Sequence, residues 1–220
     1  MKKRFVLLLT AAMLVFTVVG CGSKDSENTG DNVVTENETA EGTESEEAVV
    51  EGETAADAAV TVEVADSADV LNKVWDTFAE DQKFAAMGGD FANPVDGAAG
   101  IFNIEDTENL TYMLYIPADN VAMIDEAASL LHAMNTNTFT GAAFHLTDAA
   151  NAQALTEALK SNILSTQWMC GFPDKMVIAT VNGEYVVSAF GNAEIMDNFK
   201  TKLTEVYGDA AVIVVEENIA

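Results

Sequence analysis

KMVIATVNGEYVVSAF, residues 175–190, is the stretch that best indicates the fold. Residues 175–181 and 184–190 are rich in β-branched and aromatic side chains, which favour strands. Asn182-Gly183 separates them, and this dipeptide accepts the positive φ angles of a tight two-residue turn. The stretch therefore predicts a β-hairpin.

The segments on either side extend this hairpin into a β-α-β-β-α-β order. Thr147-Asp148 is a capping signal for a helix before the hairpin. After it, Asn192 caps a second helix, and Gly208 fits the position just past that helix. The order is typical of a split βαβ, ferredoxin-like unit, so we predict an α+β domain with an antiparallel-dominated sheet and helices on one face. The outer elements are strands at 138–146 and 211–215 and helices between 148 and 164 and between 192 and 208.

Upstream of this unit, the sequence predicts a helix, a strand and a second helix. Apolar residues recur at helical spacing over 69–84 and again over 120–134. Residues 110–116, LTYMLYI, have a strand pattern. Between the first two elements, 85–109 is interrupted by four glycines and one proline. We expect a long loop there, with a short strand at 100–104. The sequence leaves open whether this loop forms a binding site.

The first twenty residues have the features of a bacterial lipoprotein signal peptide. Residues 2–4 are basic, and 5–19 are apolar except for two threonines, too short a run for a typical membrane-spanning helix. They end in Val18-Val19-Gly20-Cys21, which resembles the lipobox of lipoprotein precursors. The resemblance implies cleavage after Gly20 and a thioether-linked diacylglycerol, with palmitate as the expected acyl chain, on Cys21. An ordinary signal peptide with a chance cysteine is the alternative.

An acidic tether then separates the anchor from one domain. Residues 21–66 contain 14 acidic residues, one lysine and no aromatic residue. Such a segment buries too little apolar surface to offset its ordering entropy, so we predict a disordered linker, with a glycosylated stalk or a calcium-gathering tail as alternatives. Residues 67–220 suit a single domain with its own core. Because two acyl chains give stable anchoring, we expect this domain at the extracytoplasmic face of the cell membrane.

The charge of the chain excludes some partners. It has 36 acidic residues against ten lysines and arginines, a formal charge of −26. Removal of residues 1–20 also removes Arg4, the only arginine. So acidic a surface repels nucleic acid, and no guanidinium remains to bind carboxylates or phosphates. We therefore expect no nucleic-acid partner.

With Cys21 committed to lipid, Cys170 is the only cysteine that keeps a free thiol. It lies in QWMCGFPD, residues 167–174, and no second free cysteine remains for a disulfide. A nucleophilic thiol needs a base, and the chain offers only His132 and His145. We expect His145 to lie toward the opposite end of the sheet from Cys170. We therefore predict no catalytic residue and expect Cys170 to be a small buried packing residue, with a catalytic thiol, a metal ligand or an intermolecular bond as alternatives.

No other pattern indicates a cofactor or a metal. The histidines and cysteines lack the close spacing of zinc ligands, and the nine methionines form no dense run that would indicate copper. The acidic residues at 105–108 and the segment 90–97 lack the rhythm of a calcium loop. Gly88-Gly89 is followed by no lysine of a phosphate-binding loop. We expect neither a cofactor nor a metal site.

From about Asp66 onward, the chain resembles small lipoproteins of Gram-positive bacteria that carry a C-terminal domain of unknown function. The resemblance rests on the opening helix and on three stretches, AAFHL (142–146), LKSNILSTQWMCGFPDK (159–175) and NGEYVVSAFG (182–191). Such a family implies the order of lipobox, acidic linker and domain. It implies no activity and therefore assigns no catalytic or binding residue.

We therefore predict a lipid-anchored, non-enzymatic binding or interaction module, with a protein, a peptide or a cell-wall component as its partner. One alternative is a thiol-dependent enzyme or redox protein in which Cys170 acts with His132 or His145. The other is a lipoprotein that captures a small solute. An exposed apolar patch would favour the first function, and a sulfur within hydrogen-bond reach of an imidazole would favour the second.

Overall fold

The computed structural model describes residues 60–219, and the predicted hairpin lies inside its sheet. β6 (Lys175–Val181) and β7 (Tyr185–Gly191) pair antiparallel. Asn182 and Gly183 have φ angles of 54° and 72°, the two positive values that a tight type I′ turn needs. The predicted hairpin is confirmed.

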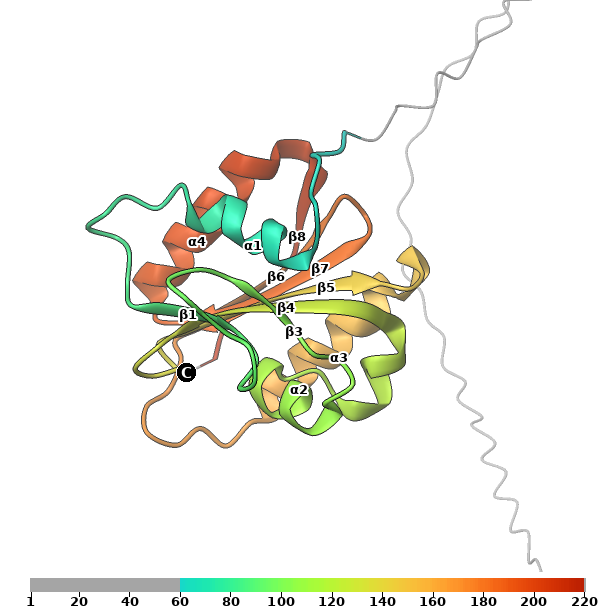
Figure 1. The fold of residues 1–220 in the computed structure, drawn as a ribbon, viewed down its shortest axis with the longest axis horizontal. Coiled ribbons are helices and arrows are strands. Elements are labelled where there is room, and N and C mark those ends of the chain that lie inside the picture. The colour runs from blue at the N-terminus through green and yellow to red at the C-terminus, as the bar shows by residue number, and fades with distance from the viewer. Residues whose placement is uncertain (1–59, 220) are drawn as a thin grey trace, which may run out of the picture. The chain divides into compact units, whose positions relative to one another are not determined.

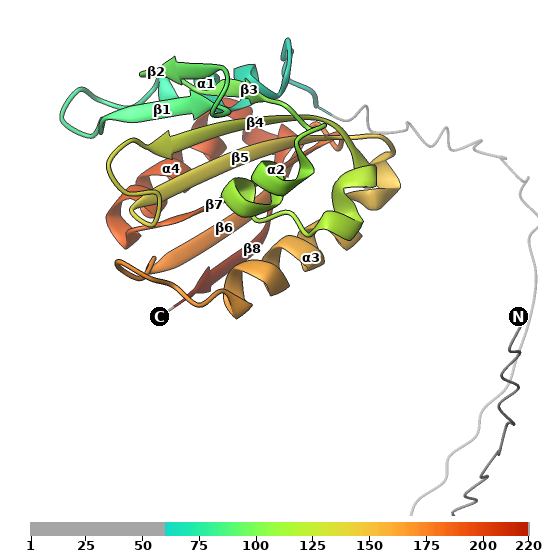
Figure 2. The same ribbon diagram turned by 60° about the horizontal axis from the view of Figure 1, so that its bottom comes forward.

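The hairpin belongs to an eight-stranded sheet whose paired strands are all antiparallel (Figures 1 and 2). The strand order is β2-β1-β4-β5-β7-β6-β8, with β3 beside β4. The predicted α+β class is confirmed, as is the β-α-β-β-α-β order of the C-terminal half. The remaining strands are β1 (Ala86–Gly89), β2 (Pro94–Asp96), β3 (Gly100–Phe102), β4 (Ile124–His132), β5 (Phe139–Leu146) and β8 (Ala211–Asn218).

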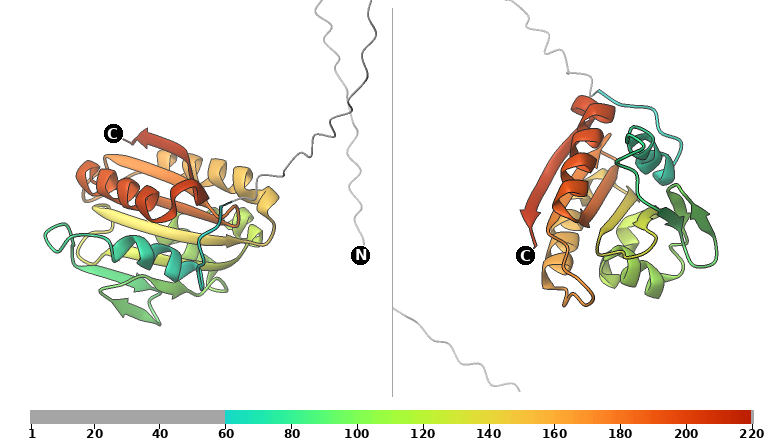
Figure 3. Two further views of the ribbon diagram at one scale, coloured as in Figure 1. Left: turned by 90° about the horizontal axis from the view of Figure 1, so that it is seen from above. Right: turned by 90° about the vertical axis from the view of Figure 1, so that its left-hand side faces the viewer.

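The α-helices of the described chain cover the two faces of the sheet in pairs. α1 and α4 pack on one face, and α2 and α3 on the other (Figures 2 and 3). Successive residues of β7 show the alternation, because Val187 contacts the α1–α4 core and Val186 contacts the α2–α3 core. The helices are α1 (Ser67–Trp75), α2 (Thr107–Leu114), α3 (Ala152–Ser165) and α4 (Ala193–Tyr207), with short 3-10 turns η1 (Ala118–Met123), η2 (Ala149–Asn151) and η3 (Gly208–Ala210).

One detail of the predicted fold needs correction, because the helices cover both faces of the sheet rather than one. An α+β unit with segregated helices keeps them on a single face. Here β4 pairs with the edge of β5 that lies away from the hairpin, and β8 pairs with β6. α3 connects the parallel strands β5 and β6, and α4 connects the parallel strands β7 and β8. Both connections move across the sheet in the same direction, but β5 and β7 run in opposite directions. Since such crossovers are right-handed, their helices lie on opposite faces.

The two elements upstream of β5 have exchanged types. The strand predicted at 110–116 is part of helix α2, which the Asp106 carboxylate caps by accepting a hydrogen bond from the backbone N–H of Asn109. The helix predicted at 120–134 is instead η1 followed by strand β4. β4 lies inside the sheet and is buried on both faces. Its sequence therefore lacks the alternation of apolar and polar residues that identifies a half-exposed strand. The first predicted helix is confirmed only over α1.

Glycine permits a close backbone contact where β1 and β3 meet. Both strands pair with the same edge of β4, one after the other, and the chain between them folds out as β2. A Cβ atom at Gly88 would lie 2.3 Å from the backbone N of Gly100 and 2.5 Å from the carbonyl O of Ala98. Gly88 is therefore a packing requirement of the sheet.

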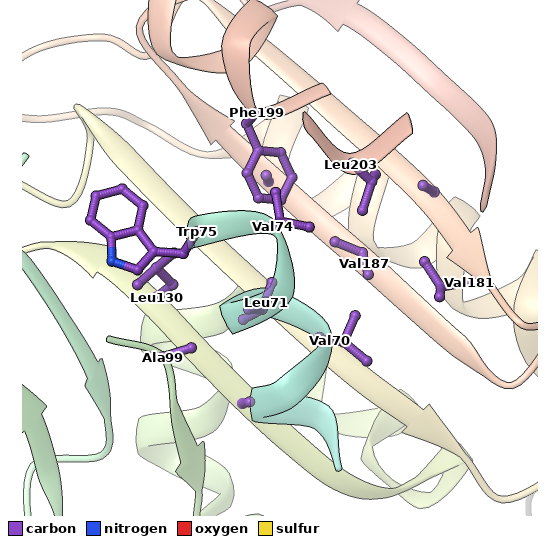
Figure 4. Packing of buried hydrophobic residues seen from close by; sticks show 14 of the residues in the cluster. Val70, Leu71, Val74, Trp75, Ala99, Leu130, Val181, Val187, Phe199 and Leu203 are labelled. Carbon is purple, nitrogen blue, oxygen red and sulfur yellow. The ribbon is translucent and has the colours of Figure 1, made fainter. Parts of the chain in front are cut away.

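α1 packs directly on β4 and β5 and also against α4. Val70, Leu71 and Val74 have no solvent-exposed surface, and Figure 4 shows Val74 beside Phe199 of α4. The hydroxyl of Tyr207, near the end of α4, donates a hydrogen bond of 3.0 Å to the carbonyl of Val70. Burial of this apolar surface is the main stabilising contribution to this half of the domain.

The described chain enters the domain through residues 60–66. The backbone N–H of Val62 donates to Asn182 Oδ1 at 2.9 Å, and Asn182 Nδ2 donates to the Val62 carbonyl at 2.8 Å. The packed chain thus begins a few residues before the predicted boundary at residue 67. The predicted signal peptide, the Gly20–Cys21 site and the tether up to residue 59 lie outside the described residues. Within 60–219, no helix combines the length and apolar character needed to cross a membrane.

β8 forms one edge of the sheet and is irregular. Ile178 of β6 pairs with Val215, and the next residue pairs with Ile213, so Val214 bulges out of the ladder. Beyond the bulge, Glu216 accepts hydrogen bonds from Lys200 at 2.7 Å and from Lys175 at 3.4 Å. These contacts, chiefly that with Lys200, lower the pKa of Glu216.

Candidate functional site

A cleft of about 840 Å³ lies between three segments that are distant in the sequence. They are α2, the loop 133–137 between β4 and β5, and the loop 166–170 after α3. Figure 2 shows the two loops at the same end of the sheet. None of the lining residues is charged. The aromatic and methionine residues that line it are Phe91, Tyr112, Met113, Tyr115, Met134, Trp168 and Met169, and the amides are Asn135, Asn137, Asn162 and Gln167.

Trp168 forms the base of the cleft. Its side chain is only 9% exposed, and its ring packs against Tyr115 at 5.4 Å and Phe190 at 5.0 Å between centroids. The indole Nε1 is buried without a hydrogen-bond partner among the described residues, as is Oγ1 of Thr111 in the α2 wall. A buried polar group without a partner costs about 1–3 kcal/mol. A rearrangement of the loop 166–170 that gives this N–H an acceptor would therefore remove this free energy cost.

Asparagine side chains hold the walls of the cleft together. Asn137 Nδ2 donates to the carbonyls of Met169 at 2.8 Å and Gly171 at 2.9 Å, which ties the β4–β5 loop to the loop after α3. Asn162 Nδ2 on α3 donates to the carbonyl of Tyr115 at 2.7 Å, which ties α3 to the end of α2. The walls are thus formed by internal contacts, as expected of a preformed binding site.

Large apolar side chains stand exposed at the mouth of the cleft. Tyr112 is 75% exposed, Met134 83% and Met169 79%. Phe91, which also lines the cleft, is exposed by more than half. Single exposed apolar residues are ordinary, but several around one cleft are typical of an interaction site.

The expectation that Cys170 is a buried packing residue is wrong. Its side chain is exposed and lines the cleft. The backbone of Cys170 has φ 64°, and Gly171 continues with φ 117°, so the chain turns sharply here. The residues that this loop buries are Trp168 and Pro173. The larger indole occupies the interior position, and the small thiol faces outward.

Neither histidine lies with Cys170. His145 is at the far end of β5 from the loop 133–137, as expected from the sequence. Its Nδ1 contacts Asp125 Oδ1 at 2.5 Å, and its ring packs edge-on against Tyr185. His132 stacks on Phe84, and its Nδ1 accepts the backbone N–H of Met134 at 3.2 Å. Within the described chain, no hydrogen bond joins the Cys170 sulfur to an imidazole, so the weak catalytic candidates Cys170, His132 and His145 form no constellation.

Asp90 fixes the loop that carries Phe91 to the cleft. Its Oδ1 accepts the backbone N–H groups of Ala92 at 2.8 Å and Asn93 at 2.7 Å, and its Oδ2 accepts that of Asn103 at 3.0 Å. Burial is the largest single influence and favours the protonated acid, but these donors, Asn93 first, together outweigh it and lower the pKa of Asp90. The segment 85–109 contains β1, β2, β3 and the start of α2, and β3 lies where a short strand was predicted, at 100–104.

Asp90→Asn should destabilise the protein by about 1–2 kcal/mol at neutral pH, because the amide keeps one acceptor oxygen where the carboxylate has two. Since the pKa of Asp90 is lowered on folding, its contribution is present above the unfolded value of about 4 and is lost as the pH falls through the folded value. The free energies of unfolding of wild type and Asp90→Asn, measured with urea, should therefore differ at neutral pH, and this gap should narrow in acid. Asp96→Asn, at an exposed acid on β2, is the control and should show no gap. A gap of equal size in acid and at neutral pH would contradict this role.

The candidate metal ligands, the acidic residues at 105–108 and Gly88-Gly89 form no metal or phosphate site among the described residues. Among residues 60–219, no group of three or more histidine, cysteine or acidic side chains is placed to hold a metal ion. The acidic run 105–108 is the start of α2, where Asp106 serves as the helix cap. Gly88-Gly89 belongs to the β1–β3 junction.

Sequence reasoning missed the α2 side of the cleft. LTYML was assigned to a strand, which hid the position of Tyr112 and Thr111 beside the loop after α3. The acidic start Asp106-Thr107-Glu108 is a helix-start signal and could have corrected the assignment. In QWMCGF, the sequence analysis considered only Cys170, and it did not predict the exposure of Met169.

The chain matches no protein-family model, no curated protein and no solved structure.

Proposed function

We propose that this protein is a lipid-anchored, extracytoplasmic binding module that holds a ligand in the cleft between α2 and the loops 133–137 and 166–170, without catalysing a reaction. One observation carries the proposal: the cleft has an uncharged lining and an exposed apolar mouth on an otherwise acidic domain. Ligand sites are typically concave, mostly apolar and provided with a few fixed polar groups.

The arrangement of Cys170 supports binding over thiol catalysis. A thiol nucleophile is activated by a base within hydrogen-bond reach. His145 is at the other end of the sheet, and His132 stacks on Phe84 and accepts the backbone N–H of Met134. A small solute is a second candidate ligand, because the volume of the cleft falls within the range of about 300–1,000 Å³ that is common for small-molecule sites. The lipid anchor rests on the Gly20–Cys21 sequence.

Cys170 offers a direct test, because it is exposed and lines the cleft. A thiol reagent should label it in the native protein at a rate within about tenfold of that in urea. A photoreactive benzophenone attached there, on intact cells, should then form a discrete adduct with the bound partner.

The control moves the label to the opposite end of the sheet, in a Cys170→Ser, Asp209→Cys variant. Asp209 lies in η3 and is exposed. We expect adducts from position 170 that disappear in Tyr112→Ala, and none from position 209. Labelling of Cys170 only after unfolding, or adducts that ignore Tyr112→Ala, would refute the cleft as the site.

A further inference from the structure

The lysines of the domain are all occupied by internal ion pairs. Residues 60–219 contain six lysines and 24 acidic residues. Each lysine contacts at least one carboxylate of the same chain within 4.0 Å. Six carboxylates make these contacts, so most acidic side chains have no lysine partner within the described chain. The outward electrostatic field is therefore negative, and it attracts cationic partners and repels anionic ones.

An acidic residue also stands beside the mouth of the cleft. Glu108 is exposed and lies one helical turn before Tyr112 on α2, so the two side chains lie on the same side of the helix. Asp174, which follows the loop after α3, is also exposed, but its Oδ2 accepts the backbone N–H of Ala193 at the start of α4 and not a group of the cleft. The cleft is thus an uncharged apolar surface with the carboxylate of Glu108 beside it.

The side chains at the mouth suit an apolar anchor of a protein. Tyr112, Met134 and Met169 are exposed, and methionine adapts its shape to different apolar partners. Aromatic and methionine residues are also the types enriched at the centres of protein interfaces. Many of the amide donors are already committed to the walls, because the Nδ2 groups of Asn135, Asn137 and Asn162 donate to backbone carbonyls.

We propose that the occupant of the cleft is a cationic protein segment. An aromatic or aliphatic side chain of the segment enters between Tyr112, Met134 and Met169, and a lysine or arginine beside it lies near Glu108. This inference rests on the proposed function and specifies its ligand class. The apolar contact supplies most of the affinity, and the charges set the choice of partner and the rate of association.

The test is a selection from a random dodecapeptide library against the membrane-extracted protein in a non-ionic detergent. We expect selected peptides with an aromatic or aliphatic centre and a lysine or arginine beside it. Their affinity should fall about tenfold or more in Tyr112→Ala and should weaken as salt is raised. Glu108→Lys should reduce the affinity about fivefold. Asp209→Lys makes the same change in net charge at the far end of the sheet and should leave the affinity within about twofold of wild type.

Other outcomes separate this inference from the proposed function. Selected peptides without positive charge, or equal effects of Glu108→Lys and Asp209→Lys, would overturn the cationic segment. If no peptide depends on Tyr112, a panel of neutral oligosaccharides and small solutes is applied to the same protein. Binding that Tyr112→Ala removes would then keep the cleft as the site and replace the ligand class. Absence of any Tyr112-dependent ligand in both screens would overturn both proposals.

Discussion

Gly88→Ala should prevent the protein from folding. The added methyl carbon would lie 2.3 Å from the backbone N of Gly100, 2.5 Å from the carbonyl O of Ala98 and 2.6 Å from the carbonyl C of Ala99. All three are backbone atoms, so no side chain can rotate away. Because β1 and β3 share one edge of β4, relief requires one of them to leave the ladder. We expect a loss of at least about 4 kcal/mol, a large part of the total stability of a domain.

Gly97→Ala is the matched control, because it also adds one methyl group in the same region. Gly97 has φ 77°, but nothing lies within 4 Å of the position of its Cβ. Only the left-handed backbone opposes the change, at about 1 kcal/mol. Circular dichroism and urea unfolding should show a folded Gly97→Ala protein and an unfolded or aggregated Gly88→Ala protein. Equal stability of the two variants would contradict the junction described for β1 and β3.

Cys21→Ser should abolish the incorporation of labelled palmitate into the protein. A hydroxyl group cannot form the thioether that the predicted lipobox implies, and Cys170 lies in the folded domain, far along the chain from the predicted signal peptide. Acyl chains contribute about 0.8 kcal/mol per buried CH₂ group, so loss of the diacylglycerol removes the main contribution to anchoring. The measurement is metabolic labelling followed by isolation of the protein from membranes.

Cys170→Ser is the control and should incorporate palmitate as the wild type does. Label that persists in Cys21→Ser but disappears in Cys170→Ser would place the acylation in the cleft and contradict both the anchor and the thiol probe. Absence of label from all variants, with the wild-type protein released from the membrane, would favour an ordinary signal peptide.

The elements that could be predicted from the sequence are those with local chemistry of their own. The hairpin of β6 and β7 depends on Asn182-Gly183, and α4 ends where Gly208 can adopt φ 52°. β5 and α3 are separated by Asp148, whose side chain accepts the N–H of Ala150. Each of these features acts within a few residues, so it is visible before the chain is folded.

The predictions for β4 and α2 were wrong because the secondary structure of these segments depends on their contacts with the rest of the chain. β4 contains Ala127 and Ala128, which face opposite cores, and such a residue pair gives no signal of alternation. In α2, Leu110 and Leu114 are buried at helical spacing, but Thr111 and Tyr112 between them raise the strand propensity. The position of α4 opposite α3 likewise depends on which strand edge β4 occupies.

The cleft could not have been predicted, apart from one of its loops. Trp168 and Cys170 are noticeable in the sequence, but their exposures are the reverse of what a small thiol and a large indole in a turn suggest. Tyr112 and Met134 reach the same cleft from segments that are separated by much of the fold. Proximity of this kind follows from the strand order and from the hydrogen bonds of Asn137 and Asn162, which sequence spacing does not reveal.

The bulge at Val214 has a consequence for how copies of this protein coexist. β8 is an eight-residue edge strand, and an edge strand of that length is a template on which a second sheet can grow. A regular β8 would therefore favour the growth of one sheet from the edge of another. The bulge breaks the hydrogen-bonding repeat that the edge of a second copy would have to match. β8 therefore acts as a cap on the sheet, which opposes edge-to-edge pairing of copies of this chain.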